Sequence, residues 1–327
     1  TREAKQVLDI PNDIPIEFVA NIAQIQKNMG VSYLAEDELI DIAKTLKTSR
    51  LVKKFLSDNL TMMSILRNAA QNLLTDKQLE DKIFGTFDEN LNIRPDATQE
   101  LKNLYVSLRD NEKNLKTTVN ALLNSASFSK HLQENIYTTR DDRIVFQVMA
   151  SSKSKVPGIV HDVSATSKTF YIEPEQIVPL NNKIREIKAN IHSEMVKILS
   201  GLTSLVKNEI KELALSEQIL ATIDYHFAKA RYAVKLHAIE PEIVTHKFVE
   251  FENMKHPLLI GNVENVVTNN FEIGKDYKSV IITGSNTGGK TVTIKTIGLF
   301  ILMSKSGMFL PCTAAKVYPF ENVFADI

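Results

Sequence analysis

The chain has 327 residues, of which 43% are hydrophobic and 24% charged, and its 39 Lys+Arg balance 39 Asp+Glu. This composition excludes a disordered, collagen-like or disulfide-stapled protein, and zero net charge argues against a uniformly basic nucleic-acid binder. The length predicts two or three structural units. A single cysteine, Cys312, and the lack of a membrane-length apolar run predict a cytoplasmic protein with no membrane partner. Because the chain opens on Thr1 and closes within an apolar run, we expect it to be a fragment.

Apolar residues at helical spacing predict three helices in the N-terminal part, over 14–29, 35–56 and 60–74. The second helix carries its apolar residues on one face: Leu39, Ile42, Leu46, Leu51 and Phe55. A turn-rich connector is expected over 84–95. The first part of the chain therefore predicts a helical body.

Two longer helices are predicted further along. Asp96, with Gln99 three residues later, has the pattern of a capping box and predicts a helix that runs to about Leu132. Over 175–235 apolar residues alternate in steps of three and four, which is typical of a long coiled-coil-like helix. Gly201 is the expected interruption. We expect the two helices to pack as an antiparallel pair. The apolar stripe along them fits either ordinary helix packing or a mechanical lever.

Between these two helices the pattern changes to that of strands. The runs 143–149, 158–160 and 168–172 are rich in β-branched and aromatic residues, and Ser, Lys, Pro and Gly separate them. They predict a small antiparallel sheet at the tip of the helix pair.

After His237 the pattern becomes α/β. Short strands are predicted over 248–251 and 278–283, and a helix over 291–304. Between the second strand and the helix, GSNTGGKT fits the phosphate-loop pattern G-x-x-x-x-G-K-[ST] at every fixed position. The residues of this loop are Gly284, Ser285, Asn286, Thr287, Gly288, Gly289, Lys290 and Thr291.

The loop predicts binding of a nucleoside triphosphate together with Mg²⁺. Glycines allow successive amide N–H groups to point inward, and the start of the following helix adds a positive end. Lys290 is expected to reach the β- and γ-phosphates, and the Thr291 hydroxyl to bind Mg²⁺.

A hydrolysis site also needs a Walker B carboxylate that positions the metal ion and the water. No hydrophobic run ending in Asp-Glu follows Thr291, and Asp326 is better explained as a strand-edge carboxylate. No catalytic set is therefore complete in this chain. We expect the chain by itself to bind nucleotide without turning it over.

Several separated motifs together resemble the MutS family of ABC-type ATPases. KHPLL at 255–259, VVTN at 266–269 and the loop with its flanks at 280–296 occur in the order found in that family. Further motifs resemble the second bacterial MutS paralogue, which lacks the mismatch-reading domains. These are RDDR at 140–143, PGIVHDVS at 157–164, YIEP at 171–174, Asn181-Asn182, and NVFADI at 322–327.

The resemblance implies a mixed fold. A long-helix core and lever bundle with a small antiparallel β clamp would precede a truncated α/β P-loop ATPase domain of the ABC type. The predicted parts are a helical core domain at 1–95, a first lever helix at 96–135, the clamp at 136–174, a second lever helix at 175–237, and the first half of the ATPase domain at 238–327.

The resemblance also implies which residues bind the nucleotide base. His256 would lie near the adenine of ATP, and Val266 and Val267 would border it. Val266 stands where mismatch-repair relatives often have a stacking aromatic residue, and Ser285 replaces the proline usual in the loop.

What the resemblance implies about activity concerns the full-length protein. It would be an ATPase whose ATP-dependent dimerisation closes a clamp on branched DNA or on stalled or collided ribosomes, and a C-terminal domain absent here would add endonuclease activity. The partners would be a second copy of the chain and DNA or ribosomal RNA. In the clamp, the residues suited to phosphate contact are Arg140, Arg143, Lys153, Lys155 and Lys168. The alternative function is a non-enzymatic helical scaffold with a structural nucleotide site.

Overall fold

The computed structural model describes residues 1–8, 13–30, 33–285 and 288–325. The chain divides into two compact units. The first unit comprises residues 1–24, 41–80 and 209–327, and the second unit comprises residues 25–40 and 81–208.

The elements follow one another in an order that changes from helix to sheet twice. The helices are α1 (Arg2–Leu8), α2 (Ile22–Asn28), α3 (Glu36–Asn59), α4 (Ile65–Gln71), α5 (Lys77–Thr86), α6 (Gln99–Asn124), α7 (Ala126–Ser129), α8 (Val178–Asn208), α9 (Ile210–Lys235) and α10 (Lys290–Lys305), with a 3-10 helix at Ala150–Lys155. The strands are β1 (Leu132–Arg140), β2 (Arg143–Met149), β3 (Gly158–Val163), β4 (Thr169–Pro174), β5 (Glu242–Ile243), β6 (Val249–Met254), β7 (Asn269–Ile273) and β8 (Ala314–Val317).

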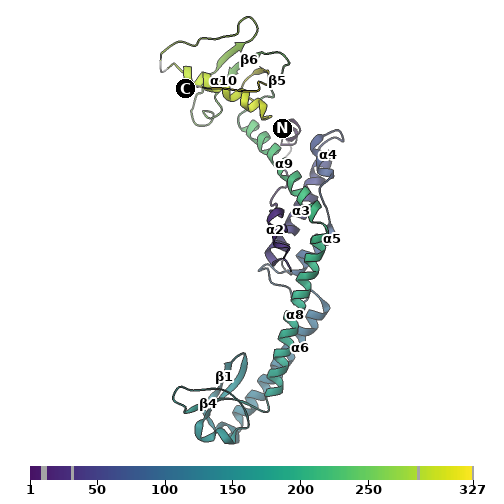
Figure 1. The fold of residues 1–327 in the computed structure, drawn as a ribbon, viewed down its shortest axis with the longest axis vertical. Coiled ribbons are helices and arrows are strands. Elements are labelled where there is room, and N and C mark those ends of the chain that lie inside the picture. Colours follow the sequence, from purple (N-terminus) through teal and green to yellow (C-terminus); the bar gives the residue numbers. More distant parts are fainter. Residues whose placement is uncertain (9–12, 31–32, 286–287, 326–327) are drawn as a thin grey trace. The chain divides into compact units, whose positions relative to one another are not determined.

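In the second unit, α6 and α8 lie side by side, with β1 and β4 beyond one end of the pair (Figure 1). The four strands form an antiparallel sheet in the order β1-β2-β4-β3, which confirms the predicted small sheet and adds β1 to it. Apolar residues one helical turn apart join the sheet to the helices. Leu115 and Val119 of α6 share a buried cluster with Phe146, Ile172 and Ile184.

The ends of the long helices differ from the sequence predictions. Thr98, rather than Asp96, caps α6, and its hydroxyl accepts the Leu101 amide at 3.1 Å. The helix stops at Asn124, where Ser125 has extended backbone angles. The break in the second long helix falls at Glu209 instead of Gly201, which stays helical within α8. A single glycine inside a helix costs only about 1 kcal/mol, which the packing of α8 offsets.

A buried carboxylate joins three strands of the sheet to α8. Glu173 of β4 is fully buried and accepts hydrogen bonds from the Arg143 Nη1 at 2.8 and 2.9 Å, from the Asn181 Nδ2 at 2.8 Å, and from the His161 ring at 2.6 Å. These partners come from β2, α8 and β3. Because a buried charge must be both paired and hydrogen-bonded, this cluster fixes how β2, β3, β4 and α8 meet.

In the first unit, the N-terminal helices pack around α9. Phe227 and Leu220 of α9 are fully buried against Leu56 of α3 and Ala70 of α4. The predicted helix over 14–29 is wrong for its first half, and helix begins only at Ile22.

Proline and side-chain bonds explain this shorter helix. Pro15 disfavours helical geometry at the residue before it. The extended backbone of this segment is held instead by Thr45 and Thr48, whose hydroxyls bond the Ala20 amide and the Phe18 carbonyl at 2.9 Å each.

The predicted helix over 60–74 is likewise shorter in the structure. It begins at Ile65, because Ser64 caps it and the Glu3 carboxylate accepts the Ile65 and Leu66 amides at 2.9 Å each. A carboxylate at this position satisfies donors that an uncapped helix start leaves free.

The C-terminal part of the first unit carries a sheet in the order β5-β8-β6-β7, in which only β5 and β8 run parallel. Helix α10, close to the predicted 291–304, lies against this sheet (Figure 1). The Phe300 ring of α10 meets the Phe251 ring of β6 edge-on, with 5.0 Å between the ring centroids. The predicted strand over 278–283 is wrong: these residues form no strand, and Ile281 is 88% exposed. A strand needs a hydrogen-bonded neighbour, and within the described residues none pairs with this segment.

Among the described residues, no helix combines the length and the apolar character that crossing a membrane requires.

The Glu173 cluster generates a prediction about the second unit. Glu173→Ala leaves Arg143 and His161 without their carboxylate and should destabilise the β2–β4 sheet by about 3–5 kcal/mol. Asp162→Ala removes an exposed partner of Arg140 and should cost no more than about 1 kcal/mol. Hydrogen exchange of the β2 and β4 amides measures both. Equal protection in the two variants would contradict the role given to Glu173.

Glu80 generates a pH-dependent prediction for the first unit. The guanidinium of Arg50, at 2.8 and 2.9 Å, holds the pKa of the buried Glu80 carboxyl below its ordinary value, and Lys77 adds to this. A lowered pKa stabilises the fold above the unfolded value of about 4.3, and the gain is lost as the pH falls through the folded value. The free energy of unfolding should therefore be larger for the parent than for Glu80→Gln at pH 7. This difference should shrink below pH 4. Urea denaturation at both pH values measures it.

Candidate functional site

The glycine-rich loop leads directly into α10. Gly289 is the residue before the helix and has φ of +77°, and Gly284 has φ of +149°. Both conformations favour glycine, because a Cβ would be strained there. A Cβ on Gly288 would lie 3.2 Å from both the carbonyl oxygen and the hydroxyl of Ser285. The backbone course of the loop therefore favours glycine at 284 and 289, and the Ser285 contacts leave little room for a side chain at 288.

The start of α10 offers donors to an anion. Its first turn holds no acidic residue, and Lys290 and Thr291 open it. The Lys290 amine donates to the Gly284 carbonyl, so this side chain lies across the loop. The unpaired amides of a helix start carry partial positive charge and suit a phosphate. Asn286 and Thr287, which complete the predicted loop, lie outside the described residues.

His256 lies on the side of α10. Its ring is half-buried, and burial, followed by the charge of Lys295 in α10, lowers the pKa of this histidine. The Leu258 amide approaches the His256 Nδ1 at 3.3 Å. A lowered pKa keeps the imidazole neutral near pH 7, so it can offer a hydrogen bond or a flat surface without a charge.

Val266 and Val267 differ in their surroundings. Val266 is half-buried and lines a pocket of about 400 Å³ together with Lys255, Thr268 and Pro311. Val267 is 79% exposed. Of these two neighbouring valines, only Val266 therefore has a side chain that is partly shielded from solvent.

Asn269, at the start of β7, contacts the first turn of α10. Its amide donates to the Thr293 hydroxyl at 3.4 Å, and that hydroxyl in turn donates to the Gly289 carbonyl at 3.0 Å. Asn269 closes the VVTN motif, but the sequence analysis did not select it as a site residue. A side-chain amide at the end of a motif that opens with two valines is the signal that could have identified it.

A metal ion at this loop would depend on few protein atoms. Among the described residues, no three His, Cys, Asp or Glu side chains are arranged to hold a metal ion. The hydroxyl of Thr291, which is exposed, is the ligand that the loop pattern offers to Mg²⁺, and this ion commonly takes one or two protein ligands together with phosphate oxygens. Cys312 is buried, and burial raises the pKa of its thiol to about 12, so it is no metal ligand or nucleophile at neutral pH.

The five basic residues predicted for the clamp have different environments. Arg143 is 13% exposed and is committed to Glu173, with Asn182 as a further acceptor. Arg140 lies over the Tyr171 ring at 4.2 Å and pairs with Asp162 at 3.3 Å. The structure therefore gives both arginines internal partners.

The three lysines lie on or beside the 3-10 helix that follows β2. Lys153 and Lys155 belong to the 3-10 helix, and the Ala150 amide at its start donates to the Lys168 carbonyl at 3.0 Å. All three side chains are exposed, as is that of Lys130, which the sequence analysis did not select. The neighbouring His131 carbonyl accepts the Met149 amide at 3.0 Å, so Lys130 lies close to the start of the 3-10 helix.

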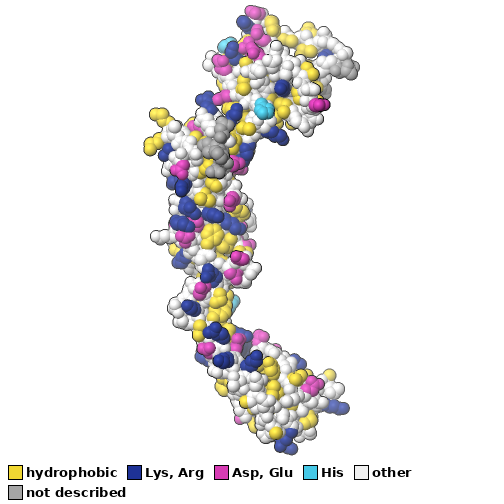
Figure 2. All heavy atoms as spheres, turned by 180° about the vertical axis from the view of Figure 1, so that it is seen from behind, with side chains coloured by type: hydrophobic (Ala, Val, Ile, Leu, Met, Phe, Trp, Pro, Cys, Tyr) yellow, Lys and Arg dark blue, Asp and Glu magenta, His cyan; other side chains and the backbone are white. Residues whose placement is uncertain are grey.

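These lysines are a local feature. On the face in Figure 2, Lys and Arg are interspersed with Asp and Glu, in keeping with the zero net charge. We use the name lysine corner for Lys130, Lys153, Lys155 and Lys168.

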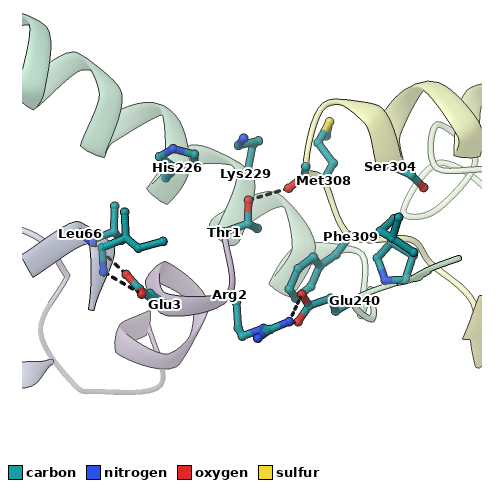
Figure 3. Close-up of a pocket in the computed structure, with 14 residues that line it drawn as sticks. Thr1, Arg2, Glu3, Leu66, His226, Lys229, Glu240, Ser304, Met308 and Phe309 are labelled. Carbon is teal, nitrogen blue, oxygen red and sulfur yellow. Dashed lines mark hydrogen bonds and ion pairs between the residues drawn. The ribbon is translucent and has the colours of Figure 1, made fainter. Parts of the chain in front are cut away.

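A second hollow lies in the first unit, where α1, α4 and α9 approach the segment after α10 (Figure 3). It has a volume of about 460 Å³. Arg2 and Glu240 pair across it at 2.6 Å, and Lys229 and His226 enter it from α9. None of these residues was predicted from the sequence to have a function.

Comparison with known proteins covers the whole chain. Residues 280–327 match the family model MutS domain V. Proteins named Endonuclease MutS2 align with the full chain: that of Alkaliphilus oremlandii is 33% identical, that of Geobacillus sp. strain WCH70 35%, and that of Symbiobacterium thermophilum 36%. The chain spans 42%, 42% and 41% of their respective lengths. Because the alignments run from end to end of this chain and agree with the motifs and with the domain model, the chain belongs to the MutS2 group of the MutS family.

Proposed function

We propose that the chain binds ATP with Mg²⁺ at the loop formed by residues 284–291. The observation that carries this proposal is the backbone of Gly284 and Gly289, whose positive φ angles bend the loop into the start of α10. A loop with this course presents amide donors to phosphate oxygens, and Lys290 adds a cation beside them.

Each residue has a distinct part in this proposal. The loop amides and Lys290 bind the phosphates, and the Thr291 hydroxyl is the protein ligand for Mg²⁺. In this proposal His256 and Asn269 border the nucleotide, with Val266 and Val267 beside the adenine. Bound Mg²⁺ would neutralise charge on the phosphates.

For the longer protein we propose an ATPase that dimerises around its nucleotides and closes its sheet on a nucleic acid. The relatives are named endonucleases, and an endonuclease activity is proposed here for the longer protein only. Branched DNA and ribosomal RNA are the two proposed targets, and the lysine corner is their proposed contact, because exposed lysines bind phosphates without regard to sequence.

Lys290→Ala tests the nucleotide site. Loss of one charge-assisted phosphate contact should weaken ATP binding by about 1.5–3 kcal/mol, or roughly ten- to a hundred-fold. Lys305→Ala is the matched control: it lies at the opposite end of α10 and donates to the Glu321 carbonyl at 2.7 Å. Calorimetry with Mg-ATP measures both variants. If Lys290→Ala bound as tightly as the parent, the phosphate site would lie elsewhere.

Charge reversal tests the lysine corner. Lys153→Glu combined with Lys155→Glu should weaken binding to a four-way DNA junction and to a ribosomal RNA helix, and should make log K less steep in log salt by about 2 if both contacts are lost. Lys113→Glu combined with Lys116→Glu makes the same charge change on exposed positions of α6. Fluorescence anisotropy at several salt concentrations measures the slopes. Equal slopes for the two double variants would place the nucleic-acid contact outside the lysine corner.

A further inference from the structure

Lys229 joins α9 to the end of α10. The residue lies on α9 and is 8% exposed, and its amine donates to the Ser306 carbonyl at 3.0 Å. Ser306 is the residue at which α10 ends. In Figure 3, Lys229 extends from α9 toward the segment that follows α10, beside Met308.

The end of α10 is well suited to a buried amine. The last carbonyls of a helix lack partners within the helix and carry partial negative charge. Gly307 follows in a left-handed conformation, with φ of +69°, and a Cβ built on it would lie 3.5 Å from the Lys229 amine. On the other side, the Tyr225 ring lies 4.2 Å from the same amine. The amine is therefore held between α10 and a ring of its own helix, and burial lowers its pKa.

The contact between α9 and α10 has an apolar part and a directional part. Ala233 and Leu236 share a buried cluster with Phe300 and Met303 of α10. Apolar contacts of this kind tolerate small shifts between helices, since the hydrophobic effect has no direction. A buried amine must keep its acceptor, because leaving it unsatisfied is costly. Lys229 therefore adds a directional restraint on the position of α10 along α9 to the apolar contacts.

The two ends of α10 thus make different contacts. The first turn begins with Lys290 directly after the loop, and the cap residue Ser306, which follows the last turn, accepts the hydrogen bond from Lys229. A helix of 16 residues with regular hydrogen bonds moves as one body, so a shift at its start reaches its end. We propose that Lys229 is a positioning residue that transmits nucleotide occupancy at the start of α10 to α9.

This inference rests on the proposed nucleotide site, and the experiment separates the two. The full chain is studied with and without the non-hydrolysable analogue AMP-PNP and Mg²⁺. Calorimetry gives the affinity, and hydrogen exchange of the α9 amides gives the response of that helix.

Three variants make the test specific. Lys229→Met removes the amine but keeps a side chain of similar length, and Lys229→Arg retains a cation. Lys53→Met is the matched control, because the Lys53 amine on α3 donates to the Gln71 carbonyl at the end of α4 at 2.7 Å, away from α10. It therefore removes the same kind of lysine-to-helix-end contact within the same unit.

The expected results distinguish coupling from a structural role. In the parent and in Lys53→Met, AMP-PNP should slow α9 exchange by about three-fold or more. Lys229→Met should keep the affinity for AMP-PNP within about three-fold of the parent but lose the α9 response, and Lys229→Arg should restore part of it. If Lys229 were purely structural, its replacement by Met would instead speed α9 exchange equally with and without nucleotide.

Other outcomes would overturn the inference. An unchanged α9 response in Lys229→Met, or no α9 response in a parent chain that binds AMP-PNP, would show that Lys229 does not transmit occupancy. A parent chain that fails to bind AMP-PNP would refute the proposed function, and the inference with it. If Lys229→Met does not fold, Lys229→Gln takes its place, because it leaves a polar group in the hollow.

Discussion

The contact between Phe300 and Phe251 is the constraint on which the candidate site depends. Both rings are almost completely buried, and they meet edge-on, so α10 has one position on the sheet. The glycine-rich loop, the Asn269–Thr293 hydrogen bond and the Lys229 contact all depend on the position of this helix. A site assembled around one packed helix is therefore only as well ordered as the apolar face of that helix.

Buried charges determine which elements of this chain pack together. Glu173, Glu80 and Lys229 each sit almost out of contact with water, and each is bound by groups from other elements of its own unit. Such groups add little net stability compared with apolar residues of similar size. Their effect is selective, because an alternative packing would leave a charge without partners. They therefore specify which elements meet within each unit.

Sequence patterns predicted the elements that depend on local periodicity, and failed where distant partners decide. Helix α10 and strands β2 and β4 were predicted because their apolar spacing is regular. The strand over 278–283 was wrong because strand structure depends on a neighbour. Lys229 could not be identified, since a lysine beside Phe227 on an apolar helix predicts only that its amine reaches toward water.

The burial of Cys312 has a practical consequence for measuring motion in this protein. Its thiol is shielded and stays protonated at the pH used for maleimide or nitroxide attachment, because its pKa is about 12. A cysteine introduced at an exposed position would react while the native thiol stays inert. The two units can therefore each receive a single probe without first removing the natural cysteine, and the distance between the probes can be followed in a chain whose core is unaltered.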